Sequence, residues 1–223
     1  MSSCDLTLNG ATLTARETGA LWWAEARLLC VSDLHLGKSE RIARRGGALL
    51  PPYETRETVD RLAREILALA PATVVCLGDS FDDLAACDSL AEEDRTRLQT
   101  LMAGRRWIWI EGNHDPGPLG LGGTHLDELR EGPLTFRHIA QRGETAGEVS
   151  GHYHPKASLT LRGKRMTSAC FVRDAQRLIL PAFGAYTGGL KVSSPAIRGL
   201  VAADATVRLT RAPQHDIPLD LCA

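Results

Sequence analysis

The chain has 223 residues, of which 43% are hydrophobic and 24% charged, and this size and balance fit one globular domain with a substantial core. Its formal net charge of −1 excludes a uniformly basic nucleic-acid-binding protein, so a polyanion would have to be held by local patches or by metal. No run approaches the roughly 18 apolar residues of a membrane span, and the first residues lack the basic start and apolar stretch of a signal peptide. We therefore expect a single domain over residues 1–223 in a cytoplasmic protein without membrane association.

Three short apolar runs in the first half of the chain each lead into polar residues. Residues 27–32 (RLLCVS) precede Asp33, residues 73–77 (TVVCL) precede Asp79, and residues 106–110 (RWIWI) precede the sequence EGNH. Runs of this length predict buried strands. Their carboxyl ends would then carry the polar side chains.

Between these runs, apolar residues recur at the spacing of an α-helix. Residues 54–69 carry apolar side chains about one helical turn apart, and residues 90–102 continue in the same style. Strands that alternate with helices in this way predict a layered α/β core.

After residue 132 the pattern changes to short β-like pieces: PLTFRH, GEVSGHYH, ASLTLRG, ACFVRD, RLILPAFG, AIRGLVA and ATVRLT. This half is predicted to be mostly sheet. A domain boundary here is one interpretation. Histidines of the motifs described next occur on both sides of it, so we favour one domain in which two sheets share a site.

Four tryptophans stand in two local groups, Trp22 with Trp23 and Trp107 with Trp109. Side chains of this size indicate either core packing or a face on which a homodimer forms. They carry no information about function.

Four short motifs contain most of the chemistry of the chain: D-x-H, G-D-x-x-D, G-N-H-D and G-H-x-H. Each is weak by itself, because a lone Asp after a strand is usually a cap or turn residue and a lone His is usually not a ligand. Their order, with three directly after predicted strands, makes coincidence improbable. The candidate residues are Asp33, His35, Asp79, Asn113, His114, His152 and His154.

The spacing of these residues has a chemical rationale. Residues two apart in an extended segment point the same way, so Asp33 with His35, and His152 with His154, can each aim two ligands at one centre. Carboxylate and amide oxygens mixed with imidazoles suit Mn²⁺, Fe or Zn²⁺. Two such ions roughly 3.5 to 4 Å apart, with Asp79 as a bridge, suit phosphoester hydrolysis.

These motifs resemble those of the calcineurin-like metallophosphoesterases. The resemblance implies an α/β fold in which a double β-sheet sandwich is flanked by helices, with two divalent metal ions at the strand ends. The first ion would be held by Asp33, His35, Asp79 and His154. The second would be held by Asp79, Asn113, His152 and one further histidine.

That further histidine should lie between GNHD and GHYH, where His125 and His138 are available. His138 ends the alternating segment that contains Leu134 and Phe136, so a strand can aim it, whereas His125 follows a glycine-rich stretch. We favour His138.

The resemblance also implies roles next to the metals. His114 would protonate the leaving oxygen or stabilise the transition state, with Asp115 orienting its ring, or else it would be an outer-sphere partner of a metal. Asp82, which closes G-D-x-x-D, would support a ligand.

Features outside the metal motifs bear on the substrate. DLHLGK, CFVRD, GHYHP and the stretch PAFG-x-x-TGG at residues 181–189 resemble the bacterial ligase-associated DNA-damage-response endonucleases, which often have a His where Asp82 stands here. The stretch at 181–189 is not needed for metal binding and is therefore a selective marker of that branch. The resemblance implies a manganese-dependent endonuclease acting on single-stranded DNA in repair, with a ligase, helicase or exonuclease as partners. The alternatives are a phosphatase, cyclic-nucleotide or lipid-pyrophosphate hydrolase using the same metals, or a catalytically silent scaffold.

Two basic stretches offer modest support for DNA. Either they hold phosphates on both sides of a scissile bond or they are ordinary solvated charges. The first consists of the candidate substrate-binding residues Lys38, Arg41, Arg44 and Arg45, and the second of Arg162, Lys164, Arg165 and Arg173.

Overall fold

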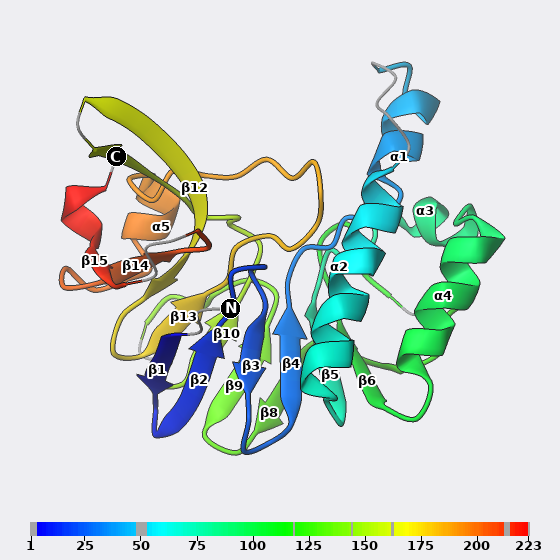
Figure 1. The fold of residues 1–223 in the computed structure, drawn as a ribbon, viewed down its shortest axis with the longest axis horizontal. Coiled ribbons are helices and arrows are strands. Elements are labelled where there is room, and N and C mark those ends of the chain that lie inside the picture. Colours follow the sequence, from blue (N-terminus) through cyan, green and yellow to red (C-terminus); the bar gives the residue numbers. More distant parts are fainter. Residues whose placement is uncertain are drawn as a thin grey trace.

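The structure is a computed structural model and describes residues 4–47, 53–117, 119–143, 145–161, 163–211 and 215–222. Two β-sheets pack against each other, and helices cover the outer face of the first (Figure 1). This arrangement confirms the predicted α/β sandwich. Arg162 lies outside the described residues.

The first sheet is antiparallel at its amino-terminal side and parallel at the other, because β4 to β7 run in the same direction. Its strands lie in chain order: β1 (Cys4–Leu8), β2 (Ala11–Ala15), β3 (Leu21–Trp23), β4 (Leu28–Val31), β5 (Thr73–Leu77), β6 (Arg106–Ile110) and β7 (Thr124–Leu126). The three predicted strands are therefore confirmed as β4, β5 and β6.

The second sheet is built from the carboxyl-terminal half, as predicted. Its order is β15 (Ile217–Pro218), β14 (Thr206–Leu209), β12 (Lys164–Arg173), β13 (Arg177–Ile179), β10 (Glu148–Ser150), β9 (Leu134–Arg137) and β8 (Glu128–Glu131), and β11 (Lys156–Leu161) pairs with β12. Here β9, β10 and β13 are mutually parallel.

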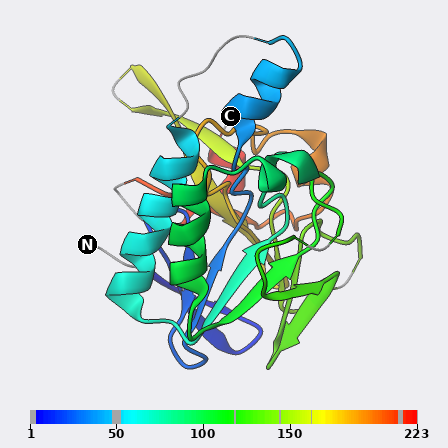
Figure 2. The same cartoon turned by 90° about the vertical axis from the view of Figure 1, so that its right-hand side faces the viewer.

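The helices are α1 (Lys38–Arg44), α2 (Glu54–Leu69), α3 (Leu84–Asp88), α4 (Glu92–Met102), α5 (Pro195–Arg198) and a 3-10 turn at Leu219–Leu221. α2 and α4 lie side by side over the first sheet (Figure 2). The prediction of β structure for AIRGLVA was wrong. Ser194 accepts a hydrogen bond from the Ala196 N–H and Pro195 follows this cap, so the segment begins as a short helix instead.

Hydrophobic packing explains the sandwich. One cluster fills the space between the sheets and includes Leu13, Ile108, Phe136 and Phe171, and a second lies between the first sheet and its helices. Trp23, Trp107 and Trp109 are buried in these clusters. Of the two interpretations of these tryptophans, core packing is therefore confirmed at those three positions.

In the described part of the chain, no helix combines the length and the apolar character needed to cross a membrane.

The loops that follow the parallel strands lie at the carboxyl ends of those strands. β4, β5 and β6 of one sheet, and β9, β10 and β13 of the other, are followed by the segments that contain the candidate ligands and residues 181–189. α1 and the β11–β12 hairpin project beyond the edge of the sheets at which β4 ends (Figures 1 and 2).

Candidate metal centre

The loops that follow these strands bring all seven predicted ligands together. Asp33, His35 and His154 form one group in which a possible ligand atom from each lies within 4.8 Å of the others, and Asp79, His138 and His152 form a second. Asn113 joins the second group, since its Oδ1 is 3.0 Å from His138 Nε2. The site is therefore assembled from both sheets.

In the first group, His154 Nε2 lies 3.1 Å from Asp33 Oδ1. Apart from this ion-pair contact with Asp33, the Nε2 atoms of His35 and His154 are buried without a hydrogen-bond partner among the described residues. Buried polar atoms are normally satisfied. A cation bound between these nitrogens and the Asp33 carboxylate would satisfy both.

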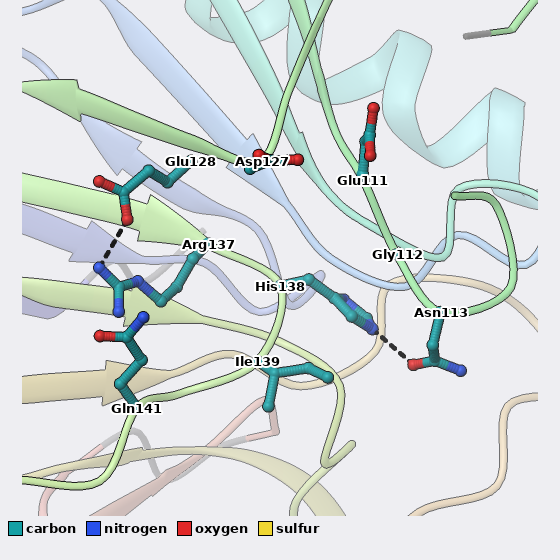
Figure 3. A pocket seen from close by; sticks show the side chains of 9 residues that line it. All are labelled: Glu111, Gly112, Asn113, Asp127, Glu128, Arg137, His138, Ile139 and Gln141. Atoms are coloured by element: carbon teal, nitrogen blue, oxygen red, sulfur yellow. Dashed lines mark hydrogen bonds and ion pairs between the residues drawn. The ribbon is translucent and has the colours of Figure 1, made fainter. Parts of the chain in front are cut away.

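In the second group, His138 Nε2 faces three neighbours: Asn113 Oδ1 at 3.0 Å, His152 Nδ1 at 3.1 Å and Asp79 Oδ2 at 3.4 Å. Figure 3 shows the His138 ring and the Asn113 amide turned toward each other. The other ring nitrogen of His138 is 2.8 Å from the Leu77 carbonyl oxygen, which fixes the proton on Nδ1 and leaves the Nε2 lone pair facing the group. This donor set fits a divalent ion.

Asp79 lies between the two groups. Its Oδ2 is 3.4 Å from His138 Nε2 and 4.0 Å from His35 Nε2. Burial alone would favour the neutral acid, but interactions with His138 and His114 outweigh it and lower the pKa of Asp79 to about 2. The carboxylate is thus charged and placed to bridge two ions.

The backbone at these positions differs from the extended conformation predicted. Asp33, His35, Asp79, His152 and His154 have φ between 46° and 70°, a left-handed conformation that non-glycine residues adopt at a cost of roughly 1–3 kcal/mol. The predicted alternation therefore holds for one pair only, since Asp33 and His35 both belong to the first group. His154 belongs to the first group and His152 to the second, so the expectation that they aim at one centre was wrong.

The predicted role of Asp115 was also wrong. Its carboxylate accepts hydrogen bonds from the backbone N–H groups of Asp79, Ser80, Phe81 and Gly112 at 2.8–3.1 Å. The His114 ring is fixed instead through Nδ1, 2.8 Å from the Asp82 carbonyl oxygen. Asp115 therefore holds the loop that carries Asp79, and it does not orient His114.

Close packing explains the glycine of the GNHD motif. A Cβ at Gly112 would lie 2.1 Å from the Asp79 amide nitrogen and 2.3 Å from Asp79 Oδ1. The His114 amide donates to the same Oδ1 at 2.8 Å. The loop after β6 thus packs directly on the Asp79 carboxylate, which only a residue without a side chain permits.

Asp82 supports His35, as the resemblance implied. Its Oδ1 is 2.8 Å from His35 Nδ1, and its Oδ2 accepts from Arg41 Nη1 at 2.7 Å. Burial opposes its ionisation, but these two partners hold the pKa of Asp82 below its ordinary range. The ring of His35 is therefore oriented with Nε2 toward the metal group.

The first basic stretch is less open to substrate than predicted. Arg41 is paired with Asp82, and Arg44 Nη2 binds both carboxylate oxygens of Asp83 at 2.7 and 2.9 Å. These ion pairs fix α1 against the loop after β5. Lys38 Nζ lies 4.0 Å from Asp82 Oδ1, and Arg45 is exposed.

The second basic stretch is divided. Lys164 and Arg165 are exposed near the end of the β11–β12 hairpin, whereas Arg173 Nη2 donates to Asp216 at 2.9 Å. Lys164 and Arg165 therefore have the solvent access that a phosphate contact requires.

Residues 181–189, which we name the strap, contribute more than the sequence analysis expected. The Phe183 N–H donates to the Ser32 carbonyl oxygen at 2.7 Å, and the Gly184 N–H donates to the Asp33 carbonyl oxygen at 3.1 Å. The stretch judged unnecessary for metal binding thus holds the backbone of the first candidate ligand, Asp33. The available signal was its place directly after a β-like run, RLIL, which delivers it to the same edge of the sheets.

A cavity of about 380 Å³ opens beside the second group and is lined by Asn113, His138 and Arg137 (Figure 3). Its lining also carries acidic side chains, namely Glu111, Asp127 and Glu128. Arg137 donates to Glu128 at 2.8 Å. The carboxylates make this side of the centre unfavourable for a polyanion.

Comparison with known proteins identifies the family of the chain. Residues 26–168, more than half of the chain, match the family described as Calcineurin-like phosphoesterase. The chain belongs to the calcineurin-like phosphoesterase family. All seven candidate ligands lie in the matched range, and membership makes the chain a hydrolase of phosphoester bonds in a family that uses two divalent metals.

The calcineurin-like chain also resembles a solved structure, that of nuclease MPE from Pseudomonas putida. The TM-score is 0.76 and the sequence identity 27%, over 97% of this chain and 100% of that chain. The similarity thus extends past the family match to the strap. No curated protein matches the chain.

The choice between His138 and His125 leads to a direct test. His125 lies on β7, stacks on Trp109 and accepts a hydrogen bond from the Leu119 N–H at 3.1 Å, so it does not reach the metal groups. We expect His138→Ala to reduce phosphodiesterase activity by at least about 100-fold, and His125→Ala to retain activity within about threefold once folded. Steady-state rates normalised to folded protein would measure both, and the reverse order would assign the ligand to His125.

Metal binding should be visible in the stability of the protein. After chelator treatment, Mn²⁺ at a hundredfold excess over its Kd should stabilise the fold by about 2.7 kcal/mol, which raises Tm by about 5–10 °C for a chain of this length. Differential scanning calorimetry would measure the shift. An unchanged Tm at Mn²⁺ concentrations that support activity would contradict a metal site built into the folded state.

Proposed function

We propose that this protein is a manganese-dependent, dinuclear-metal endonuclease that cleaves single-stranded DNA. One observation carries the proposal: two adjoining groups of imidazole and carboxylate side chains lie on either side of Asp79, whose Oδ2 is 4.0 Å from His35 Nε2 of the first group and 3.4 Å from His138 Nε2 of the second. The first ion would be held by Asp33, His35, Asp79 and His154, and the second by Asp79, Asn113, His138 and His152. The 27% identity to a nuclease over nearly the whole chain supports a nucleic-acid substrate.

The residues of the chain have separable tasks in this reaction. Two divalent ions, when bound, supply Lewis acidity and neutralise charge that develops on the phosphoryl group. His114 lies beside the first group, its ring centroid 5.1 Å from that of His35, with Nδ1 held by the Asp82 carbonyl oxygen. Its Nε2 is left to protonate the leaving oxygen. Lys38, Arg45, Lys164 and Arg165 are the exposed or partly exposed cations that would contact the flanking strand.

The chemistry of the ligands and the family resemblance support manganese and a repair setting. Oxygen ligands mixed with imidazoles suit Mn²⁺, and Fe and Zn²⁺ accept the same set. A cytoplasmic location and repair partners such as a ligase, helicase or exonuclease belong to the same proposal.

A panel that crosses metals with substrates tests the function. The purified protein would be assayed with Mn²⁺, Fe²⁺, Zn²⁺ and Mg²⁺ on single-stranded DNA, duplex DNA, RNA, a cyclic nucleotide and a chromogenic phosphodiester. We expect the highest kcat/KM for single-stranded DNA with Mn²⁺, and a steep loss with salt because several phosphates are contacted. Preference for the cyclic nucleotide, with weak salt dependence, would replace the endonuclease by a small-ester hydrolase.

A further inference from the structure

A second cavity, of about 520 Å³, adjoins the strap. Gly184 lines this cavity and also donates its N–H to the Asp33 carbonyl oxygen. A single stretch of backbone therefore contacts both the cavity and the loop of the first candidate ligand. None of the seven candidate ligands lines the cavity.

The cavity gathers positive charge from three distant parts of the chain. Arg61 comes from α2, Lys156 from the start of β11, and Arg211 from the segment after β14. The lining contains one carboxylate, Glu17. In a chain with a formal net charge of −1, this local excess of cations favours an anionic ligand.

Arg61 carries the strongest indication of a missing partner. Its Nε and Nη2 atoms are buried and have no hydrogen-bond partner among the described residues, and its Cζ lies 4.8 Å from the centroid of the Phe183 ring. Burial lowers the pKa of Arg61; of its neighbours on the same helix, Glu57 raises that pKa and Arg64 lowers it. A partly buried guanidinium with two buried, unused donor atoms is unfavourable unless an anion or another acceptor meets them.

The position of Lys156 ties the cavity to the metal centre. Lys156 follows His154 by two residues, and its Nζ donates to the Thr187 carbonyl oxygen of the strap at 3.2 Å. The cavity beside Asn113, at the second ligand group, is lined instead by three carboxylates and one cation, Arg137. A polyanion bound at the metal centre is therefore attracted by the cavity that contains Arg61 and repelled by the cavity beside Asn113.

We infer that the cavity beside the strap is a second phosphate-binding site, which holds a backbone phosphate of the nucleic-acid strand whose scissile phosphate lies at the metal centre. This inference rests on the proposed function. It assigns Arg61, Lys156 and Arg211 to the phosphate, with the strap between the two phosphate positions.

The test compares strands too short to reach the cavity with strands that reach it. kcat/KM would be measured with Mn²⁺ on a dinucleotide and on a longer single-stranded oligodeoxynucleotide, for wild type, Arg61→Gln, Lys156→Gln and Arg211→Gln. In wild type the ratio of long to short substrate should exceed one. Each variant should lower that ratio by about tenfold, the value of one charge-assisted hydrogen bond, and should reduce the salt slope by about 0.7.

Arg64→Gln is the matched control, because it removes the same charge from the same helix, one turn beyond Arg61, without lining the cavity. It should keep the wild-type ratio. If Arg61→Gln does not fold, the Arg211→Gln and Lys156→Gln ratios decide.

Two results would overturn the inference alone: wild-type ratios in the cavity variants, or an equal loss in Arg64→Gln, which would indicate general electrostatics. A wild-type protein that hydrolyses a chromogenic phosphodiester but cleaves no DNA would instead overturn the proposed function, and the second phosphate site with it.

Discussion

The Asp79→Ala variant is expected to lose Mn²⁺-dependent phosphodiesterase activity by on the order of 10³-fold, equivalent to about 4 kcal/mol of transition-state stabilisation. Asp79 is the carboxylate that lies within 4.0 Å of imidazole nitrogens from both ligand groups, so its removal affects both ions at once. Removal also leaves the His114 N–H without the acceptor that it contacts at 2.8 Å. Initial rates on single-stranded DNA and on a chromogenic phosphodiester would measure the loss.

Asp88→Ala is the matched control, because Asp88 is an exposed carboxylate at the end of α3, close in sequence but outside both groups. It should retain wild-type activity and the rise in Tm with Mn²⁺, whereas Asp79→Ala should lose most of that rise. Equal activity of Asp79→Ala and wild type would remove the basis of the two-metal assignment.

The sequence predicted those strands and helices whose apolar residues follow a regular pattern because one whole face, or both faces, of the element are buried. β4, β5 and β6 are continuous apolar runs because helices cover one face of the sheet and the second sheet covers the other. α2 was equally readable, since Val59, Leu62 and Ile66 recur on its buried face. The segment at α5 was not, because four helical residues are too few to establish a period and the capping residue Ser194 decided its structure.

The gathering of the candidate ligands at one place was predictable, whereas their backbone geometry was not. Strand ends placed Asp33, Asp79 and Asn113 at one edge of the sheet, and that deduction needs only parallel strands. Five of the seven candidate ligands have left-handed φ values, a backbone conformation that the motifs did not predict. The predicted alternation thus agrees with the grouping of Asp33 and His35 and fails for His152 and His154.

Residues that act through backbone contacts were the hardest to assign. Asp115 follows His114 in sequence, which suggested contact between their side chains, but its carboxylate turns to the amides after β5. The strap contains no ligand-type side chain, and its contribution lies in main-chain N–H groups given to Ser32 and Asp33. Contacts of this kind depend on which segments the fold brings together, so the residue types in the sequence do not predict them.

The contribution of the strap leads to the second large expected effect, for Gly184→Ala. A Cβ at this position would lie 2.0 Å from the Leu34 carbonyl oxygen and 3.0 Å from that of Asp33. Both contacts are with backbone, which cannot rotate away as a side chain can, so the strap must separate from the loop of the first ligand. We expect destabilisation of about 1–3 kcal/mol and a fall in activity of at least about tenfold, measured by chemical denaturation and by initial rates.

Gly188→Ala gives the comparison within the same segment, because a Cβ at Gly188 meets nothing within 4 Å. It should change stability by less than about 0.5 kcal/mol and leave the rates on a small phosphodiester intact. A fall in activity confined to Gly184→Ala, together with weaker Mn²⁺ binding, would place the strap among the elements that position Asp33. Similar behaviour of the two variants would mean that the strap only closes the surface, and that the loop after β4 holds its left-handed ligands without it.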